Sequence, residues 1–239
     1  MRKFIKLYRG IKLIILNSFH FKAKIIGLQL IFLIFTQGLL KFIYLKIKYK
    51  KISNKFYNYI KKFHFSRNYF NNNSEIWIDI LKKKNFLNKD LIILEIGSFE
   101  GMSLLFFQYF LKVKKIISVD FVKNKNFMKN IKSFKNIKFF NVKSEIFFKK
   151  KNNYKFDIIY VDGSHYYKDV YSDLMNSEKK LKKDGLMIID DLLLDINYRK
   201  YGMNFYEDVI GGVIMFLKKK KSKFDFVYVG HQLILKKLV

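Results

Sequence analysis

The chain has 239 residues, half of them apolar, which is enough for one domain with a substantial core and an extension. It contains no cysteine, which excludes disulfides, thiolate metal sites and cysteine nucleophiles and fits a reducing compartment. Its formal net charge is +29, but 44 Lys stand against 4 Arg and Pro is absent, a composition typical of AT-rich codon usage. Charge is therefore weak evidence for a nucleic-acid or lipid partner.

Residues 1–62 form a basic, apolar segment that we expect to be helical. Sixteen Lys or Arg precede the first acidic residue, Glu75, and residues 25–45 are apolar apart from Lys41. A stretch of 21 residues is marginal for a membrane span. Three alternatives remain: a transmembrane anchor, an amphipathic helix held on anionic lipid, or a helical extension packed on the domain or on a second copy of the chain. The two membrane alternatives are favoured.

From about residue 75, short aliphatic runs alternate with amphipathic stretches, which indicates a parallel α/β sheet. Residues 166–185 have a helical apolar stripe that Gly185 would end. The last two strands are separated only by Gly230 and His231, so they must pair antiparallel. Residues 63–239 are thus predicted to form a Rossmann-like, doubly wound domain, with strands at 91–96, 116–120, 137–142, 157–162, 186–190, 224–229 and 232–237.

The stretch ILEIGSFEGMS, residues 93–103, combines a strand, a glycine turn and the start of a helix, as nucleotide-type binding turns do. Gly97 would let a ligand approach the backbone, and Gly101 would let the helix pack closely on the strand. A turn that binds a dinucleotide has the pattern GxGxxG, and its third glycine is absent here, which makes a pyrophosphate ligand less suitable. S-adenosylmethionine carries no phosphate but a cationic sulfonium and ammonium, for which Glu95 is an apt neighbour, and Asp120 can accept both ribose hydroxyls.

At this point the sequence resembles the class I S-adenosylmethionine-dependent methyltransferases, and within them the methyltransferase domain 24 family. The resemblance covers about residues 63–239 and rests on FSRNYFNNNSEIW, ILEIGSFEGMS, FDIIYVDGSHYYKDV, LKKDGLMIIDD and HQLILKK. It implies a seven-stranded sheet whose last strand is antiparallel. It also implies that the methionine part of the cofactor is held by Glu95, Gly97, Ser98 and Gly101, the ribose by Asp120, and the adenine edge by residues 143–145, including Ser144 and Glu145.

Three carboxylates fall at the ends of the fourth and fifth predicted strands: Asp162, Asp190 and Asp191. Such oxygens suit Mg²⁺. The set looks like the metal site of catechol-type and macrolide-sugar O-methyltransferases, where the metal lowers the pKa of the acceptor hydroxyl. His165 would then be the general base beside Asp162. Each residue also has a simpler structural interpretation. Asp190 would cap the following loop, Asp191 would be a solvated turn residue, and His165 would only precede the helix that begins at Tyr166.

These features favour O-methylation of a hydroxyl on a small molecule or glycan. Methylation of a base amine is disfavoured because the Asn/Asp-Pro-Pro-aromatic motif is missing, and carbon-5 chemistry because Cys is missing. An RNA ribose methyltransferase and a non-catalytic, membrane-bound interaction module remain as alternatives. Because S-adenosylmethionine is made in the cytoplasm, we expect the catalytic domain there, attached to the inner face of the membrane if residues 25–45 bind lipid. Self-association into a homo-oligomer is a further alternative.

Overall fold

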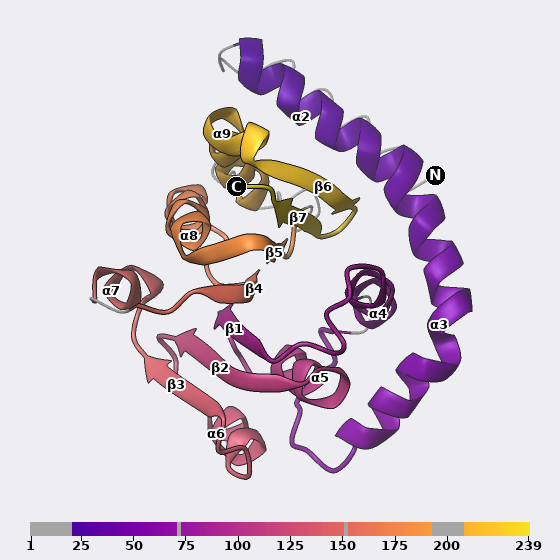
Figure 1. Ribbon diagram of the computed structural model, residues 1–239, viewed down its shortest axis with the longest axis vertical. Helices are drawn as coiled ribbons and strands as arrows, with labels where there is room; N and C mark the ends of the chain where they lie inside the picture. Colours follow the sequence, from indigo (N-terminus) through magenta and orange to yellow (C-terminus); the bar gives the residue numbers. More distant parts are fainter. Residues whose placement is uncertain (1–20, 71–72, 151–152, 193–207) are drawn as a thin grey trace. The chain divides into compact units, whose positions relative to one another are not determined.

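The structure is a computed structural model that describes residues 21–70, 73–150, 153–192 and 208–239. Within these residues seven strands form one α/β sheet, in the order β3-β2-β1-β4-β5-β7-β6 (Figure 1). The chain divides into two compact units, residues 41–163 and residues 1–40 with 164–239. The predicted Rossmann-like fold class is confirmed.

The unit of residues 41–163 holds the parallel part of the sheet. β1 pairs in parallel with β2 on one side and with β4 on the other, and β2 pairs in parallel with β3. β1 is almost fully buried, which is why its sequence is a run of aliphatic residues. The elements of this unit are α3 (Leu39–Ile60, whose first two residues belong to the other unit), α4 (Ser74–Lys83), β1 (Leu91–Ile96), α5 (Met102–Phe110), β2 (Val113–Asp120), α6 (Lys125–Ile131), β3 (Ile137–Asn141), α7 (Ser144–Lys149) and β4 (Phe156–Val161).

The second unit holds the antiparallel part. β7 pairs antiparallel with β5 and, across a connection of only three residues, with β6. α8 lies beside α9 (Figure 1). Its elements are α2 (Phe21–Leu33), η1 (Ile34–Gly38), α8 (Tyr167–Lys180), β5 (Leu181–Ile189), α9 (Val209–Lys220), η4 (Lys221–Lys223), β6 (Phe224–Val229) and β7 (Leu233–Lys237).

The boundary between α8 and β5 differs from the sequence prediction. The helix expected to run to Gly185 ends at Lys180, and β5 begins at Leu181. Lys237 explains the early end, because its ammonium donates to the backbone carbonyls of Glu178 and Leu181, at 2.7 and 3.1 Å. These contacts satisfy carbonyls at the helix terminus from 56 or more residues away, so no local pattern could predict them.

The apolar stretch 25–45 is divided among α2, η1 and α3. α2 packs on α9 within its own unit and buries Ile26, Leu30 and Ile31. Among the described helices, none is by itself both long and apolar enough to cross a membrane; α2 and α3 pass that test only when taken together as a bent pair. For the buried face of α2, the third alternative, packing on the protein, therefore applies.

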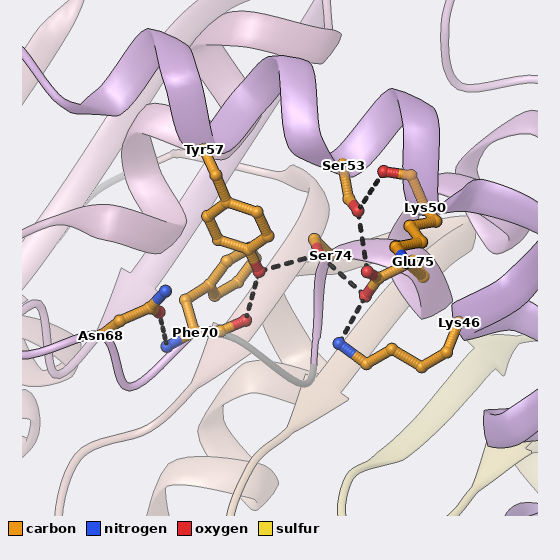
Figure 2. A network of polar contacts seen from close by, with 8 residues as sticks. All are labelled: Lys46, Lys50, Ser53, Tyr57, Asn68, Phe70, Ser74 and Glu75. Atoms are coloured by element: carbon orange, nitrogen blue, oxygen red, sulfur yellow. Dashed lines mark hydrogen bonds and ion pairs between the residues drawn. The ribbon is translucent and has the colours of Figure 1, made fainter.

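Helix α3 is built into the unit of residues 41–163 by a buried polar network with α4 (Figure 2). The Glu75 carboxylate accepts hydrogen bonds from the hydroxyls of Ser53 and Ser74, at 2.8 and 2.9 Å, and pairs with the Lys46 ammonium at 2.9 Å. Tyr57 Oη lies 2.9 Å from Ser74 Oγ. The unit of residues 41–163 thus includes residues on both sides of the predicted boundary between residues 62 and 63, and that domain boundary stays a prediction.

Candidate active site

The turn after β1 depends on two glycines with left-handed backbone angles. Gly97 has φ +82°, and a Cβ there would lie 2.0 Å from the backbone oxygen of Asp162. Gly101 has φ +81° and is the N-cap of α5, where a Cβ would lie 3.1 Å from the Phe127 ring. Gly97 thus allows the ends of β1 and β4 to meet, which is a packing reason for glycine; the ligand contact that we expected there stays a prediction.

Asp120, at the end of β2, holds this turn in place. Its Oδ2 accepts hydrogen bonds from the backbone N–H groups of Ser98 and Phe99, at 2.9 and 3.2 Å, and its Oδ1 accepts one from Val122 N–H at 2.8 Å. Each carboxylate oxygen can accept about two hydrogen bonds, so Oδ1 retains the capacity for a ligand hydroxyl. The structure therefore brings Asp120 to the predicted turn.

A pocket opens over this turn, and all of its lining residues belong to the unit of residues 41–163. Three predicted cofactor-binding residues line it, Gly97, Ser98 and Gly101, together with Asp162, a predicted catalytic residue and metal ligand. The opposite wall was not predicted. It comes from the connection between α3 and α4, which contributes Phe65, Arg67, Tyr69, Phe70 and Asn73.

We call residues 64–70 the arm, and buried polar groups attach it to the turn. The Glu100 carboxylate accepts hydrogen bonds from Ser66 N–H at 2.7 Å and from the Asn126 side chain at 2.8 Å. The Asn130 amide accepts from His64 N–H at 2.8 Å and donates to the His64 carbonyl at 2.9 Å. The only sequence signal for the arm was its presence in FSRNYFNNNSEIW, which carries no periodicity that would indicate a pocket wall.

Glu95 lies beneath the pocket rather than in its lining. Its carboxyl is fully buried; Oε1 accepts a hydrogen bond from the Ser103 hydroxyl, and Oε2 has no hydrogen-bond partner among the described residues. Burial raises the pKa of Glu95 to about 8, against the opposing effect of the Ser103 hydrogen bond. Ser98 and Ser103, its polar neighbours, both line the pocket.

These features fit a cationic, hydroxyl-bearing cofactor. A positive charge bound in the pocket above Glu95 would favour the ionised form of its buried carboxyl, whose Oε2 has no partner among the described residues, and Asp120 is an acceptor suited to ribose hydroxyls. S-adenosylmethionine supplies both, through its ammonium and sulfonium groups and its ribose, and when bound it provides an activated methyl group.

The predicted adenine contacts lie at the start of α7. Ser144 is the first residue of this helix, and Glu145 is exposed. The adjacent Lys149 ammonium lowers the pKa of the Glu145 carboxyl through a hydrogen bond and charge attraction. Neither residue is among those lining the pocket, so the adenine contact stays a prediction.

The residues predicted to act on the acceptor are distributed over both units. In the unit of residues 41–163, Asp162 Oδ2 accepts a hydrogen bond from Tyr160 Oη at 2.9 Å. In the other unit, His165 Nε2 lies 3.2 Å from Asp191 Oδ2, and Asp191 has φ +54°. A carboxylate at this distance can orient an imidazole and stabilise its protonated form.

The Asp190 side chain is hydrogen-bonded to Gln232. Its Oδ2 accepts a hydrogen bond from the Gln232 side chain at 2.7 Å, and its Oδ1 accepts one from Asp191 N–H at 2.8 Å. Asp190 is also buried, whereas His165 is exposed. Within this unit the structure thus brings His165 and Asp191 together and engages Asp190 elsewhere; the metal assignment of Asp162, Asp190 and Asp191 stays a prediction.

Residues 94–192 match the family model described as a methyltransferase domain. The match begins within β1 and includes Asp120, the turn after β4 and the acidic pair after β5. Comparison with curated protein sequences finds no match. The sheet order has the class I methyltransferase arrangement, and together with the matched segment it supports an S-adenosylmethionine-dependent methyltransferase.

Solved structures with the same fold include an O-methyltransferase, so described, from Klebsiella pneumoniae: 13% identity, TM-score 0.55, covering 74% of this chain and 83% of that one. MycE of the mycinamycin biosynthetic pathway, solved with Mg, S-adenosylhomocysteine and mycinamycin VI, has 18% identity and a TM-score of 0.55; the match covers 79% of this chain and 54% of MycE. The N-methyltransferase NodS from Bradyrhizobium japonicum WM9 has 13% identity and a TM-score of 0.50, over 73% of this chain and all of NodS. At these identities the likeness concerns the fold.

Proposed function

We propose that the protein transfers the methyl group of S-adenosylmethionine to a hydroxyl oxygen on a small molecule or glycan. The observation that carries this choice is the pairing of His165 with Asp191 at 3.2 Å, just after the Asp162-Gly163-Ser164 turn. An exposed imidazole oriented by a carboxylate suits removal of a hydroxyl proton, because its ordinary pKa of about 6.5 lies near neutral pH. Asp120 would hold the ribose, and Ser144 with Glu145 the adenine edge.

Methyl transfer is a displacement at the methyl carbon. The acceptor oxygen forms a bond to carbon, the carbon–sulfur bond breaks with its electron pair returning to sulfur, and the acceptor proton passes to His165. The protein mainly needs to position the acceptor and accept that proton. His165→Ala should therefore lower turnover by about 10²- to 10⁴-fold with a smaller effect on KM. His231→Ala, in the turn between β6 and β7, is the matched control and should retain turnover.

The oxygen assignment is tested by the position of the transferred methyl group. A panel of hydroxylated and amino-bearing small molecules is incubated with S-adenosylmethionine carrying a ¹³C methyl, and products are examined by NMR. We expect label on oxygen. Label on nitrogen would contradict the proposal and would favour N-methylation, the activity in the name of the N-methyltransferase NodS.

A divalent metal is the second part of the proposal. Asp162, Asp190 and Asp191 would supply hard oxygen ligands, and Mg²⁺ when bound would lower the pKa of the acceptor hydroxyl. Asp191 fits this role in charge, whereas Asp190 would first have to exchange its bond to Gln232. Support comes from MycE, whose structure contains Mg.

Metal binding can be measured without an acceptor. Mn²⁺ serves as the probe, and its free concentration is followed by electron paramagnetic resonance. We expect saturable binding that Asp191→Asn weakens by about tenfold. Asp184→Asn is the control, because that carboxylate forms an exposed ion pair with Lys236. Equal binding by both variants would contradict the metal proposal while leaving the oxygen assignment open to its own test.

The catalytic domain is proposed to work in the cytoplasm, where S-adenosylmethionine is made. This location is tested by fractionating cells that express the full chain and by adding protease to the outside of intact cells. A domain in the cytoplasm should be protected from digestion. Digestion of the domain by protease added outside intact cells would contradict it.

A further inference from the structure

Helix α3 has two faces of different character. One face is buried within its unit and consists of Leu45, Tyr49, Ser53, Phe56 and Ile60. The opposite face, which we call the outer face, is exposed along its length. Since successive residues of a helix turn by about 100°, the outer-face residues cluster on one side. They are Ile43, Tyr44, Ile47, Lys48, Lys50, Lys51, Asn54, Lys55 and Asn58.

The apolar part of the outer face is unusually exposed for its residue types. Ile43 is 48% exposed, Tyr44 55% and Ile47 75%. Ile43 and Ile47 are four residues apart and therefore adjacent on the helix surface. A single exposed isoleucine needs no explanation, but three large apolar side chains over two helical turns form a patch.

The charged part of the outer face has one sign only. Its four lysines are followed along the chain by Lys61 and Lys62, and α3 contains no Asp or Glu. The Lys48 ammonium lies 5.3 Å from the Tyr44 ring centre and 5.2 Å from that of Tyr49, so its aliphatic stem runs beside aromatic surface. Long side chains of this kind can bury their stems while the ammonium reaches lipid headgroups.

We propose that the outer face of α3 docks on an anionic lipid surface, with the helix lying in the plane of the interface. Apolar side chains enter the headgroup–acyl boundary, and the lysines beside them meet phosphate and carboxylate headgroups. Charge complementarity selects this partner. Nucleic acid would use the lysines but leave Ile43 and Ile47 in water, and a second copy of the outer face would place lysines against lysines.

Docking in this orientation leaves the cofactor pocket intact, because the opposite side of α3 holds the pocket wall. Tyr57 Oη contacts the Phe70 carbonyl at 3.4 Å and Ser74 Oγ at 2.9 Å, and Phe70 lines the pocket (Figure 2). The inner network remains buried while the outer face meets lipid. Vesicle binding and cofactor affinity are therefore expected to be separable by mutation.

The test uses the full chain and sedimentation with phosphatidylcholine vesicles that contain or lack phosphatidylserine. Two variants alter the outer face: Ile43→Asn with Ile47→Asn, and Lys48→Gln with Lys51→Gln and Lys55→Gln. Because the whole chain is strongly basic, the essential control removes the same charge elsewhere, by Lys132→Gln, Lys135→Gln and Lys183→Gln, all exposed. Val239→Asn is the apolar control, at 67% exposure.

We expect binding to the phosphatidylserine vesicles only, and a loss of about tenfold or more in partitioning for each outer-face variant. The two controls should bind within about twofold of the unaltered chain, and all variants should retain affinity for S-adenosylhomocysteine, which reports an intact pocket. Equal losses in both lysine variants would overturn the proposal in favour of unspecific charge attraction. Failure of the unaltered chain to bind vesicles, with a change of oligomeric state in the isoleucine variant, would assign the outer face to a second copy instead.

Discussion

At position 97 the backbone angles and the surrounding atoms leave no room for any side chain. Its φ of +82° lies in the left-handed region, and a Cβ would stand 2.0 Å from the Asp162 carbonyl oxygen, a backbone atom that cannot rotate away. Gly163 is close by, but the nearest atom to a Cβ there is the Ile96 methyl at 3.2 Å, which can shift.

This difference predicts that Gly97→Ala lowers the free energy of unfolding by about 2 kcal/mol or more, whereas Gly163→Ala changes it by less than about 1 kcal/mol. Urea unfolding of both variants, followed by circular dichroism, measures the contrast. Equal effects in the two variants would contradict the packing role that we assign to Gly97.

Glu95 makes stability depend on pH in an unusual direction. Its pKa is about 8 in the folded protein because the carboxyl is buried, against 4.5 for the ordinary group. Between these values the folded chain retains a proton that the unfolded chain has lost, so the free energy of unfolding falls as pH rises from about 4.5 to about 8.

Glu95→Gln cannot ionise and should remove this contribution. Between about pH 5.5 and pH 8 the unaltered chain should lose about 3 kcal/mol more stability than the variant. Urea unfolding at several pH values gives both profiles, and differences from other titrating groups cancel in the comparison. If the two profiles ran parallel, the raised pKa would be refuted.

At the scale of elements, the association of α3 with α4 depends on Glu75. This carboxylate is buried and receives the Lys46 ammonium and two hydroxyls, from Ser53 and Ser74. Figure 2 shows these groups converging from the two helices. Removing the carboxylate takes a buried acceptor away from the two hydroxyls and the ammonium, although Ser53 keeps its bond to the Lys50 carbonyl. The loss costs more than the pair contributes when intact.

We therefore expect Glu75→Ala to lower the free energy of unfolding by about 2 to 4 kcal/mol. The matched control is Glu145→Ala, which removes an exposed carboxylate that also pairs with one lysine, Lys149, and should change the free energy of unfolding far less. Thermal and urea unfolding provide the comparison. A Glu75 effect as small as that of Glu145 would mean that α3 is held by its aromatic contacts alone.

The elements of the sheet could be predicted where a local pattern is sufficient. The strands β1 and β6 were predicted at their observed bounds, and the short connection after β6, which spans residues 230–232 in the structure, predicted its antiparallel pairing with β7. Where a boundary depends on a distant residue, prediction failed: Lys237 ends α8 from the far end of the chain.

The same distinction applies to the candidate site. Gly97, Ser98, Gly101 and Asp120 follow strands, and strand ends of a parallel sheet share one edge, so their proximity could be inferred. The arm could not, because its place at the pocket depends on Ser66 reaching Glu100, 34 residues away, through a backbone N–H that sequence does not distinguish.

For the whole molecule, the sheet, the matched segment and the pocket lead to one central claim, that the chain binds S-adenosylmethionine on the turn after β1. The sequence left two alternatives for the N-terminal segment, binding to lipid and packing on the protein. The two helices of this segment differ in this respect. α2 buries Leu30 and Ile31 against its own unit, while the outer face of α3 remains available to a partner.

The most direct test is isothermal titration of the full chain with S-adenosylhomocysteine, compared between the unaltered protein and Asp120→Ala. We expect one saturable site in the unaltered chain and an affinity about tenfold or more lower in the variant, because Asp120 orders the turn and would supply the acceptor for the ribose hydroxyls. Circular dichroism confirms that the variant is folded. Absence of binding by the unaltered, folded chain, or equal affinity in both proteins, would contradict the claim.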